Sequence, residues 1–432
     1  MSRNQDERRL GRAYPWYLVG LLWFCGFFNY ADRMAVNAVF PVLKTEFALS
    51  NLQLGFIGSS FMIVYAASAP FAGFLVDRAS RRVLIATGLA FWSIVCAATG
   101  MVRSFGQLLV FRAAEGLGES FYFPASMTLL ADYHPPTSRS RAMSVHQTSV
   151  YVGTAGGVWL AGVLAERYGW RSPFWVLGGV GTAYAVWLTT QIVEPARGKS
   201  ELNHRSAGPY DAPADDLLAA PPPSLVANIR EIVSTPAAAL LLAVFVGANF
   251  VATAFMTWLP TFIGERFSLG LARSSLTSTA WSLASLVGVL SGGVLADLAA
   301  RRPGGRIGVQ AVALLAAAPF VFAASGAKTI PHLVLTLVGV GFCKGVYDAS
   351  IFASLFDVIR PSIRGTAAGL MNTVGWTGGA LAPIAIGAFS DVLGLGRAIG
   401  ATAPVYLIAG ALALVASRLA AAKPLRADHA VV

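Results

Sequence analysis

Charged side chains are scarce in this sequence. They make up only 12% of its 432 residues, about half the share found in an average soluble domain. Apolar residues supply 56% of the chain and gather in runs of around twenty, the length needed to cross the hydrocarbon layer of a bilayer. This composition excludes an ordinary soluble protein. It predicts an all-α membrane protein that has the lipid bilayer as its surroundings.

Cysteine and histidine are also rare, which argues against several kinds of site. The three cysteines, Cys25, Cys96 and Cys343, lie in apolar runs and have neither disulfide nor metal-binding spacing, so we expect them to be packing residues. The five histidines are scattered. The sequence has no Gly-x-x-x-x-Gly-Lys-Ser/Thr loop, which argues against ATP-driven transport. We expect no metal, no cofactor and, because no nucleophile–base constellation is present, no enzyme activity.

Positive charge is plentiful, with a formal net charge of +11. The basic residues form short clusters between apolar runs and no single patch, so we expect no nucleic-acid partner. If both termini lie on one side of the membrane, that side collects 21 of the 32 lysines and arginines and the other side 8. Arg33, Arg112 and Lys344 remain inside apolar runs. The positive-inside rule then predicts cytoplasmic termini and a cytoplasmic central linker, in the plasma (inner) membrane.

Twelve apolar runs are long enough to be transmembrane helices. They cover roughly residues 15–40, 52–76, 83–102, 107–131, 142–165, 172–193, 237–262, 273–297, 307–326, 331–356, 366–390 and 399–420. The stretch between the sixth and seventh runs is rich in Pro, Ala, Gly and charged residues, as solvated linkers are. We therefore predict an N-terminal six-helix bundle over 1–193, a cytoplasmic linker over 194–236, and a C-terminal six-helix bundle with a short cytoplasmic tail over 237–432.

The two halves repeat one another. The segment 73–82, Gly-Phe-Leu-Val-Asp-Arg-Ala-Ser-Arg-Arg, recurs at 293–302 as Gly-Val-Leu-Ala-Asp-Leu-Ala-Ala-Arg-Arg, an offset of 220. Six further residues recur with an offset of 225: Asp132, Pro136, Arg139, Gly153, Gly162 and Gly169 match Asp357, Pro361, Arg364, Gly378, Gly387 and Gly394. The chain is therefore a duplicated six-helix unit, and parallel repeats with a site between the halves are typical of transporters.

Three ionisable residues interrupt the apolar run 107–130. Arg112 and Glu119 are seven apart and share one face of a helix, while Glu115, three residues after Arg112, is close enough to pair with it. Each such group costs roughly 2.5–3.5 kcal/mol at membrane depth on insertion scales. Ionisable groups persist at membrane depth when they face a bundle interior or a wet cavity. The helical face with Arg112 and Glu119 therefore predicts a transport pathway.

The segment 73–82 resembles the signature loop of the major facilitator superfamily, and with its second copy and the six-plus-six layout the resemblance covers residues 14–421. It implies two six-helix bundles that work by alternating access. It also implies that a cytoplasmic latch is formed by Asp77, Arg78, Arg81 and Arg82, with Asp297 and Arg301 in the second copy. The second copy has Leu298 in place of the first arginine, so we expect a weaker latch there. The alternative is that these residues only anchor the topology.

Within the superfamily, two families share further residues with this chain. Both the anion:cation symporters and the spinster lipid transporters are similar to it in Asn29-Tyr30-Ala31-Asp32-Arg33 and in the spacing of Arg112 and Glu119; Phe123-Pro124-Ala125 adds to the symporter likeness. The symporters take up organic anions, such as sugar acids, with protons. Glu115 is a departure, because both families usually have an apolar residue there.

The symporter resemblance implies roles for several residues. Arg33 would bind the anion, because a planar guanidinium can hold a carboxylate with two hydrogen bonds. Glu119 and Asp32 would carry protons, with Arg112 holding Glu119 ionised until a proton or the anion competes. The alternative is a purely structural salt-bridge network. The further candidates for substrate contact are Tyr30, Tyr65, Asn372 and Gln147, and the family's fifth-helix glutamine falls on Val150 here.

Lys344 and Asp348 form the ionisable pair of the second half. Because they are four residues apart, they share a helical face and are expected to pair. Two interpretations stay open: Lys344 and Asp348 contact the substrate, with Lys344 as a second positive charge, or they neutralise each other and only help the helices to pack.

The sequence therefore predicts a secondary active transporter that carries a small organic anion, such as a sugar acid, together with protons. The proton gradient would be its driving force, and we expect a monomer. The second possibility is a spinster-like carrier of lysolipids or other amphiphiles. A non-transporting membrane sensor is the third, but the central linker is too short and too rich in proline to form an output domain.

Overall fold

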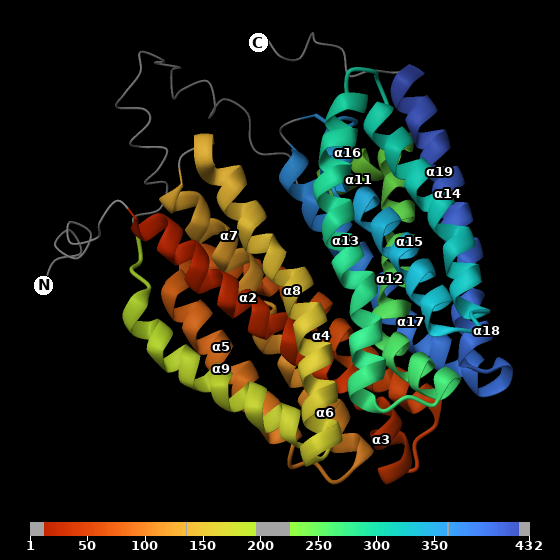
Figure 1. Ribbon diagram of the computed structural model, residues 1–432. Coiled ribbons are helices and arrows are strands. Elements are labelled where there is room, and N and C mark those ends of the chain that lie inside the picture. Colours follow the sequence, from red (N-terminus) through yellow and green to blue (C-terminus); the bar gives the residue numbers. More distant parts are fainter. Residues whose placement is uncertain (1–12, 135, 196–224, 361–362, 423–432) are drawn as a thin grey trace, which may run out of the picture. The chain divides into compact units, whose positions relative to one another are not determined.

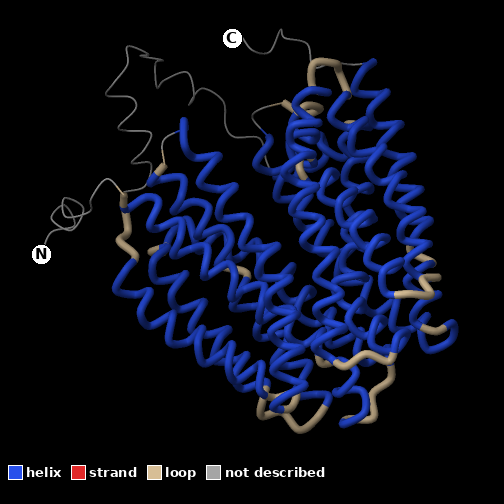
Figure 2. The backbone as a smooth tube through the Cα atoms, viewed as in Figure 1, coloured by secondary structure: helices blue, strands red, loops and turns tan. Residues whose placement is uncertain are grey.

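The computed structural model describes residues 13–134, 136–195, 225–360 and 363–422. Within these ranges all regular structure is helical and no strand is present (Figure 2). The helices of the first half are α2 (Tyr14–Ala38), α3 (Phe40–Glu46), α4 (Asn51–Arg78), α5 (Arg81–Thr99), α6 (Phe105–Glu119), α7 (Tyr122–Tyr133), α8 (Pro136–Tyr168) and α9 (Ser172–Gln191). Those of the second half are α11 (Leu225–Ser234), α12 (Pro236–Phe267), α13 (Leu271–Ala299), α14 (Gly305–Ser325), α15 (Ile330–Asp348), α16 (Ile351–Phe356), α17 (Arg364–Leu393), α18 (Leu395–Gly400) and α19 (Ala403–Ala422) (Figure 1).

The helices have the length and surface expected of membrane spans. Nine stretches of helix in the described residues are long and apolar enough to cross a bilayer. Large apolar side chains lie exposed on them, such as Ile94, Leu290 and Phe322, as expected where lipid and not water covers the surface. The predicted all-α membrane architecture is confirmed. The other three predicted spans coincide with α2, with α6 plus α7, and with α9, so the count of twelve stays a prediction.

The chain forms two compact units whose limits differ from a simple division into halves. One unit contains residues 1–36 and 64–222, and the other contains 37–63 and 223–432. The end of α2, the short helix α3 and the first half of α4 thus belong to the second unit. Most of the predicted linker, 196–224, lies outside the described residues.

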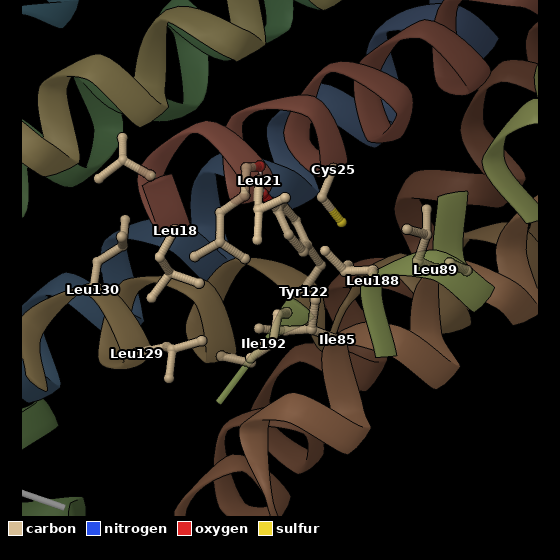
Figure 3. Close-up of a cluster of buried hydrophobic side chains, with 14 of the residues drawn as sticks. Leu18, Leu21, Cys25, Ile85, Leu89, Tyr122, Leu129, Leu130, Leu188 and Ile192 are labelled. Carbon is tan, nitrogen blue, oxygen red and sulfur yellow. Dashed lines mark hydrogen bonds between the residues drawn. The ribbon is translucent and has the colours of Figure 1, made fainter. Parts of the chain in front are cut away.

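The first unit has an apolar core made by α2, α5, α7 and α9. Leu18 and Cys25 of α2, Leu89 of α5, Leu129 of α7 and Leu188 of α9 are fully buried there (Figure 3). All three cysteines are buried and free, as their place in apolar runs indicates. This core fixes the position of α2, which carries Asp32 and Arg33, and of α5, which begins at Arg81.

In the second unit, the first half of α4 packs closely on α12 and α17. Ser59 Oγ of α4 donates to the Ala380 carbonyl of α17 at 2.6 Å. Two glycines allow this approach, because a Cβ added at Gly55 would overlap the carbonyl of Pro383 and one at Gly387 would overlap that of Asn51.

The start of α4 is capped by a carboxylate from another helix. The backbone amides of Asn51 and Leu52 each donate to the side chain of Asp391, near the end of α17, at 3.2 Å. A negative charge at a helix N-terminus satisfies orphan N–H groups and interacts favourably with the helix dipole. Asp391 therefore fastens the start of α4 to the end of α17.

Candidate functional site

Helix α2 carries two adjacent charged residues into the interior of the first unit. Asp32 is fully buried and Arg33 is 4% exposed. Adjacent residues on a helix point about 100° apart, so the two side chains reach different neighbours.

Arg33 pairs with Glu119 and lies between two tyrosines. Its Nη2 is 2.7 Å from Glu119 Oε2 and donates to Asn29 Oδ1 at 3.2 Å. The guanidinium carbon lies 4.4 Å from the centre of the Tyr30 ring and 5.5 Å from that of Tyr65, within the range of cation–π attraction. Arg33, Tyr30 and Tyr65 are thus brought together in the interior of the first unit.

Arg112 pairs with Glu115 on its own helix, α6. Its Nη1 donates to Glu115 Oε2, and its Nη2 donates to the carbonyl of Arg33 at 3.4 Å. Thr99 Oγ1, from α5, donates to the other Glu115 oxygen at 3.4 Å. The predicted pairing of Arg112 with Glu115 is confirmed, whereas the partner of Glu119 is Arg33 and not Arg112. Glu119 is two turns from Arg112, about 10 Å of helix rise, while Glu115 is one turn away.

Asp32 completes a buried cluster that has one more carboxylate than it has guanidiniums. Neither of its oxygens hydrogen-bonds to a nitrogen or oxygen among the described residues. The groups that act on it are Glu115, Glu119, Arg112 and the thiol of Cys96. A buried carboxylate without a positive partner is costly, and binding a proton removes that cost. The cluster balances its charge when it holds one proton.

A second polar chain in the first unit was missed by the sequence analysis. Tyr122 of α7 donates its hydroxyl to the carbonyl of Leu22, and His146 Nε2 of α8 lies 2.6 Å from the same hydroxyl. The sequence signal for this pair is a histidine inside an apolar run. The candidate Gln147 is exposed.

Arg81 is the centre of a charged cluster where α5 begins. It is 2% exposed and binds Asp132, at the end of α7, and Glu194, whose Oε1 is 2.8 Å from Arg81 Nε. Glu194 Oε2 also accepts from the amide of Arg82 at 2.7 Å and from Ser80 Oγ at 2.9 Å. Burial raises the pKa of the Glu194 carboxyl, but these hydrogen bonds outweigh it and hold the pKa below its usual value.

The other latch candidates of the first half behave differently. Arg82 is exposed, and its guanidinium donates to the carbonyl of Thr189. Arg78 is also exposed. The side chain of Asp77 lies outside those described. Arg81 was a latch candidate from the sequence. Glu194 was not, because it is the first residue of the predicted linker.

In the second half, Arg306 occupies the position that corresponds to Arg81. Its guanidinium lies 3.0 Å from Asp357 and 3.2 Å from Asp297. Asp357 is the repeat partner of Asp132 at the offset of 225, and the same offset takes Arg81 to Arg306. The offset of 220, seen in the segment 73–82, instead matches Arg81 with Arg301, which is exposed. The turn before α14 is longer than the turn before α5, which changes the register between the two parts of the repeat.

Lys344 and Asp348 form the ion pair that their spacing predicts. Lys344 is 6% exposed and its Nζ lies 5.6 Å from the centre of the Tyr347 ring. Asn372, on α17, is exposed. Across the described ranges, no group of three or more His, Cys, Asp and Glu side chains could hold a metal ion.

The comparisons with known proteins agree with this architecture. The Major Facilitator Superfamily model matches residues 22–383 and again 267–430. "Protein spinster homolog 1" of Bos taurus is 28% identical over 405 residues, 89% of this chain and 74% of that protein. The "Hexuronate transporter" of Bacillus subtilis (strain 168) is 25% identical over 405 residues, 92% of this chain and 91% of that protein.

A solved structure shows the same fold. It is the crystal structure of a bacterial homolog to the human lysosomal transporter Spinster, with a TM-score of 0.83, 21% sequence identity, and coverage of 95% of this chain and 98% of that one. The family match spans most of the sequence and includes the duplicated signature segment and the buried charges of α2 and α6. This chain therefore belongs to the Major Facilitator Superfamily, and it is an integral multi-pass membrane transporter and not an enzyme.

Proposed function

We propose that this transporter carries a small organic anion together with protons, and that Arg33 and Glu119 couple the two. The observation that carries the proposal is the buried ion pair between Arg33 and Glu119, at 2.7 Å. It joins a group that can hold a carboxylate to a group that can hold a proton. Two relatives with the words hexuronate and anion transporter in their names support the choice of an organic acid.

The anion competes with Glu119 for Arg33. A guanidinium binds any carboxylate in a similar geometry, so a substrate carboxylate replaces the Glu119 carboxylate once Glu119 takes a proton. Tyr30 and Tyr65 line the guanidinium with ring faces and offer hydroxyls to the rest of the substrate. Asp32 supplies a second carboxyl that can bind a proton. Gln147, Asn372, Lys344 and Asp348 are further substrate candidates, chosen from the sequence.

Proton coupling makes anion uptake favourable. An anion that enters against an inside-negative potential costs roughly 2.3 kcal/mol per charge for each 100 mV. One accompanying proton cancels that charge, and each unit of pH gradient adds about 1.4 kcal/mol. No cofactor is needed in this scheme.

The proposed location rests on the distribution of charge. The excess of lysine and arginine on one side supports cytoplasmic termini in the plasma (inner) membrane. We also propose that the protein acts as a monomer. The latch candidates Asp77, Arg78, Arg81, Arg82, Asp297 and Arg301 would then lie on the cytoplasmic face, where Arg81 already binds residues of α7 and of the segment after α9.

A screen on purified protein in liposomes tests the proposal. Liposomes with an inward proton gradient are offered sugar acids, other carboxylates and lysolipids, and uptake of each is measured with and without the gradient. We expect gradient-dependent uptake of a sugar acid, reduced at least tenfold in Arg33→Ala. Lysolipid movement alone would replace this function with that of a spinster-like carrier, which the relatives named spinster also favour. Unchanged affinity in Arg33→Ala would remove Arg33 from the anion site.

A further inference from the structure

We propose that Glu115 is a fixed counter-ion for Arg112 and that it thereby reserves Glu119 for Arg33. Its consequence for transport rests on the proposed function, whereas the charge arrangement itself can be tested without transport. Glu115 is fully buried in α6, where an ionised side chain is costly unless it is paired.

The Arg112–Glu115 pair lies within a single helix. The side chains are 2% and 0% exposed and three residues apart. Both oxygens of Glu115 have a partner, because Arg112 binds one and Thr99 donates to the other at 3.4 Å. Since donor and acceptor both belong to α6, a movement of α6 relative to α2 leaves this pair intact.

The Arg33–Glu119 pair differs in each of these respects. It joins α2 to α6, so it depends on how the two helices lie against each other. Glu119 Oε1 makes no hydrogen bond among the described residues. Of the two buried glutamates, Glu119 is therefore the one built to change its partner, and Glu115 is the one built to keep it.

Removal of the Glu115 charge would turn Arg112 toward Glu119. Loss of one partner of a buried ion pair is strongly unfavourable. Asp32 and Glu119 are the carboxylates that would remain within electrostatic range of Arg112, and Glu119 is the one on the same face of α6. The titratable and charged groups around Glu115 come from α2, α5 and α6, and they are Asp32, Arg33, Cys96, Arg112 and Glu119. Glu119 would then serve two arginines, and Arg33 would share it with Arg112.

Thermal unfolding of the purified protein in detergent tests the charge arrangement. We expect Glu115→Gln to lower Tm and the double variant Arg112→Gln/Glu115→Gln to regain most of the loss, because it removes both charges. Glu115→Gln/Glu119→Gln should lose more than the sum of the two single changes, since both arginines then lack a glutamate and Asp32 is the one carboxylate of the cluster that remains. Glu265→Gln is the matched control, because its exposed side chain pairs only loosely with Lys44, at 3.8 Å.

Strict additivity of Glu115→Gln and Glu119→Gln would overturn the proposal. So would a double variant Arg112→Gln/Glu115→Gln that is no more stable than Glu115→Gln. The first result would mean that Glu115 does not compete with Glu119 for Arg112. The second would mean that Glu115 is not the counter-ion of Arg112.

The pH profile of anion uptake tests the positioning role. In Glu115→Gln, Arg112 turned toward Glu119 should make Glu119 bind its proton at lower pH. An opposite charge within a few ångströms favours an ionised carboxylate by about one to three pH units. We therefore expect half-maximal uptake of glucuronate by Glu115→Gln to move at least about one unit to lower pH, and to return in Arg112→Gln/Glu115→Gln. A lower Tm with an unchanged pH profile would make Glu115 a purely structural residue. A wild-type protein that carries no organic anion defeats the proposed function, and the unfolding experiment then decides the role of Glu115 alone.

Discussion

Arg33 Nη2 and Glu119 Oε2 lie 2.7 Å apart in the interior of the first unit and connect α2 with α6. Helix α2 also holds Asp32 nearby, and α6 also holds Arg112 and Glu115. The three acids and two bases of this cluster are buried, so every change of partner or proton within it has a large electrostatic effect.

Acid should weaken the protein through Glu194. Its pKa in the folded protein is below its usual value of 4.5, so the folded state binds fewer protons than the unfolded state. Its stabilising effect is therefore complete above about pH 4.5 and is lost as pH falls through the folded pKa. We expect Glu194→Gln to lower Tm at pH 7 by at least about 2 °C and to reduce the fall in Tm between pH 7 and pH 4. Equal acid sensitivity in wild type and variant would contradict this.

The two arginines at corresponding positions of the repeat should differ in their contribution to stability. Arg81 is 2% exposed and binds two carboxylates, and loss of one partner of a buried ion pair costs about 3–5 kcal/mol. Arg306 binds Asp297 and Asp357, which are 79% and 47% exposed, and such pairs are worth about 0–1 kcal/mol. We expect Arg81→Gln to lower Tm clearly and Arg306→Gln to lower it slightly. A reversed order would refute this comparison.

Loss of the Asp391 carboxylate should loosen the start of α4. The side chain caps two backbone amides, and removal of a cap costs about 0.5–2 kcal/mol. Asp391→Ala should lower Tm and speed hydrogen exchange of the amides of Asn51 and Leu52. Val392→Ala is the control, because the neighbouring Val392 is 83% exposed. Unaltered exchange at both amides in Asp391→Ala would rule out the capping role.

Two glycines of α17 should respond in opposite ways to alanine. A Cβ at Gly387 would overlap the backbone of Asn51, whereas one at Gly369 has open space. Alanine favours a helix over glycine by about 1 kcal/mol, so Gly369→Ala should raise Tm or leave it unchanged. Gly387→Ala should lower Tm, because α4 must then move away from α17. Equal behaviour of the two variants in thermal unfolding would show that the close approach has no energetic weight.

The sequence predicts local features of the site well. The spacing of Arg112 with Glu115 and of Lys344 with Asp348 identifies both intrahelical pairs, because residues three or four apart on a helix are neighbours wherever the helix lies. The lengths of the apolar runs likewise locate the spans. These predictions need only the geometry of one helix.

Contacts between helices are harder to predict. The pairing of Arg33 with Glu119 depends on how α2 packs on α6, and neither residue's spacing contains that information. Glu194 follows the last helix of the first half, and only the fold brings it to the start of α5. Arg306 was missed because the extra residues in its turn shift the register of the repeat. The assignment of 37–63 to the second unit has the same cause, since it arises from packing on α12 and α17.

Simultaneous measurement of glucuronate uptake and proton entry in liposomes tests the central claim most directly. Wild-type protein should bring in protons with the anion and accumulate it under an inward proton gradient. Glu119→Gln should still exchange labelled for unlabelled anion, but it should neither accumulate the anion nor bring in protons, because the group that couples them no longer titrates. Glu265→Gln should behave as wild type does. Accumulation driven by the proton gradient in Glu119→Gln would contradict the account.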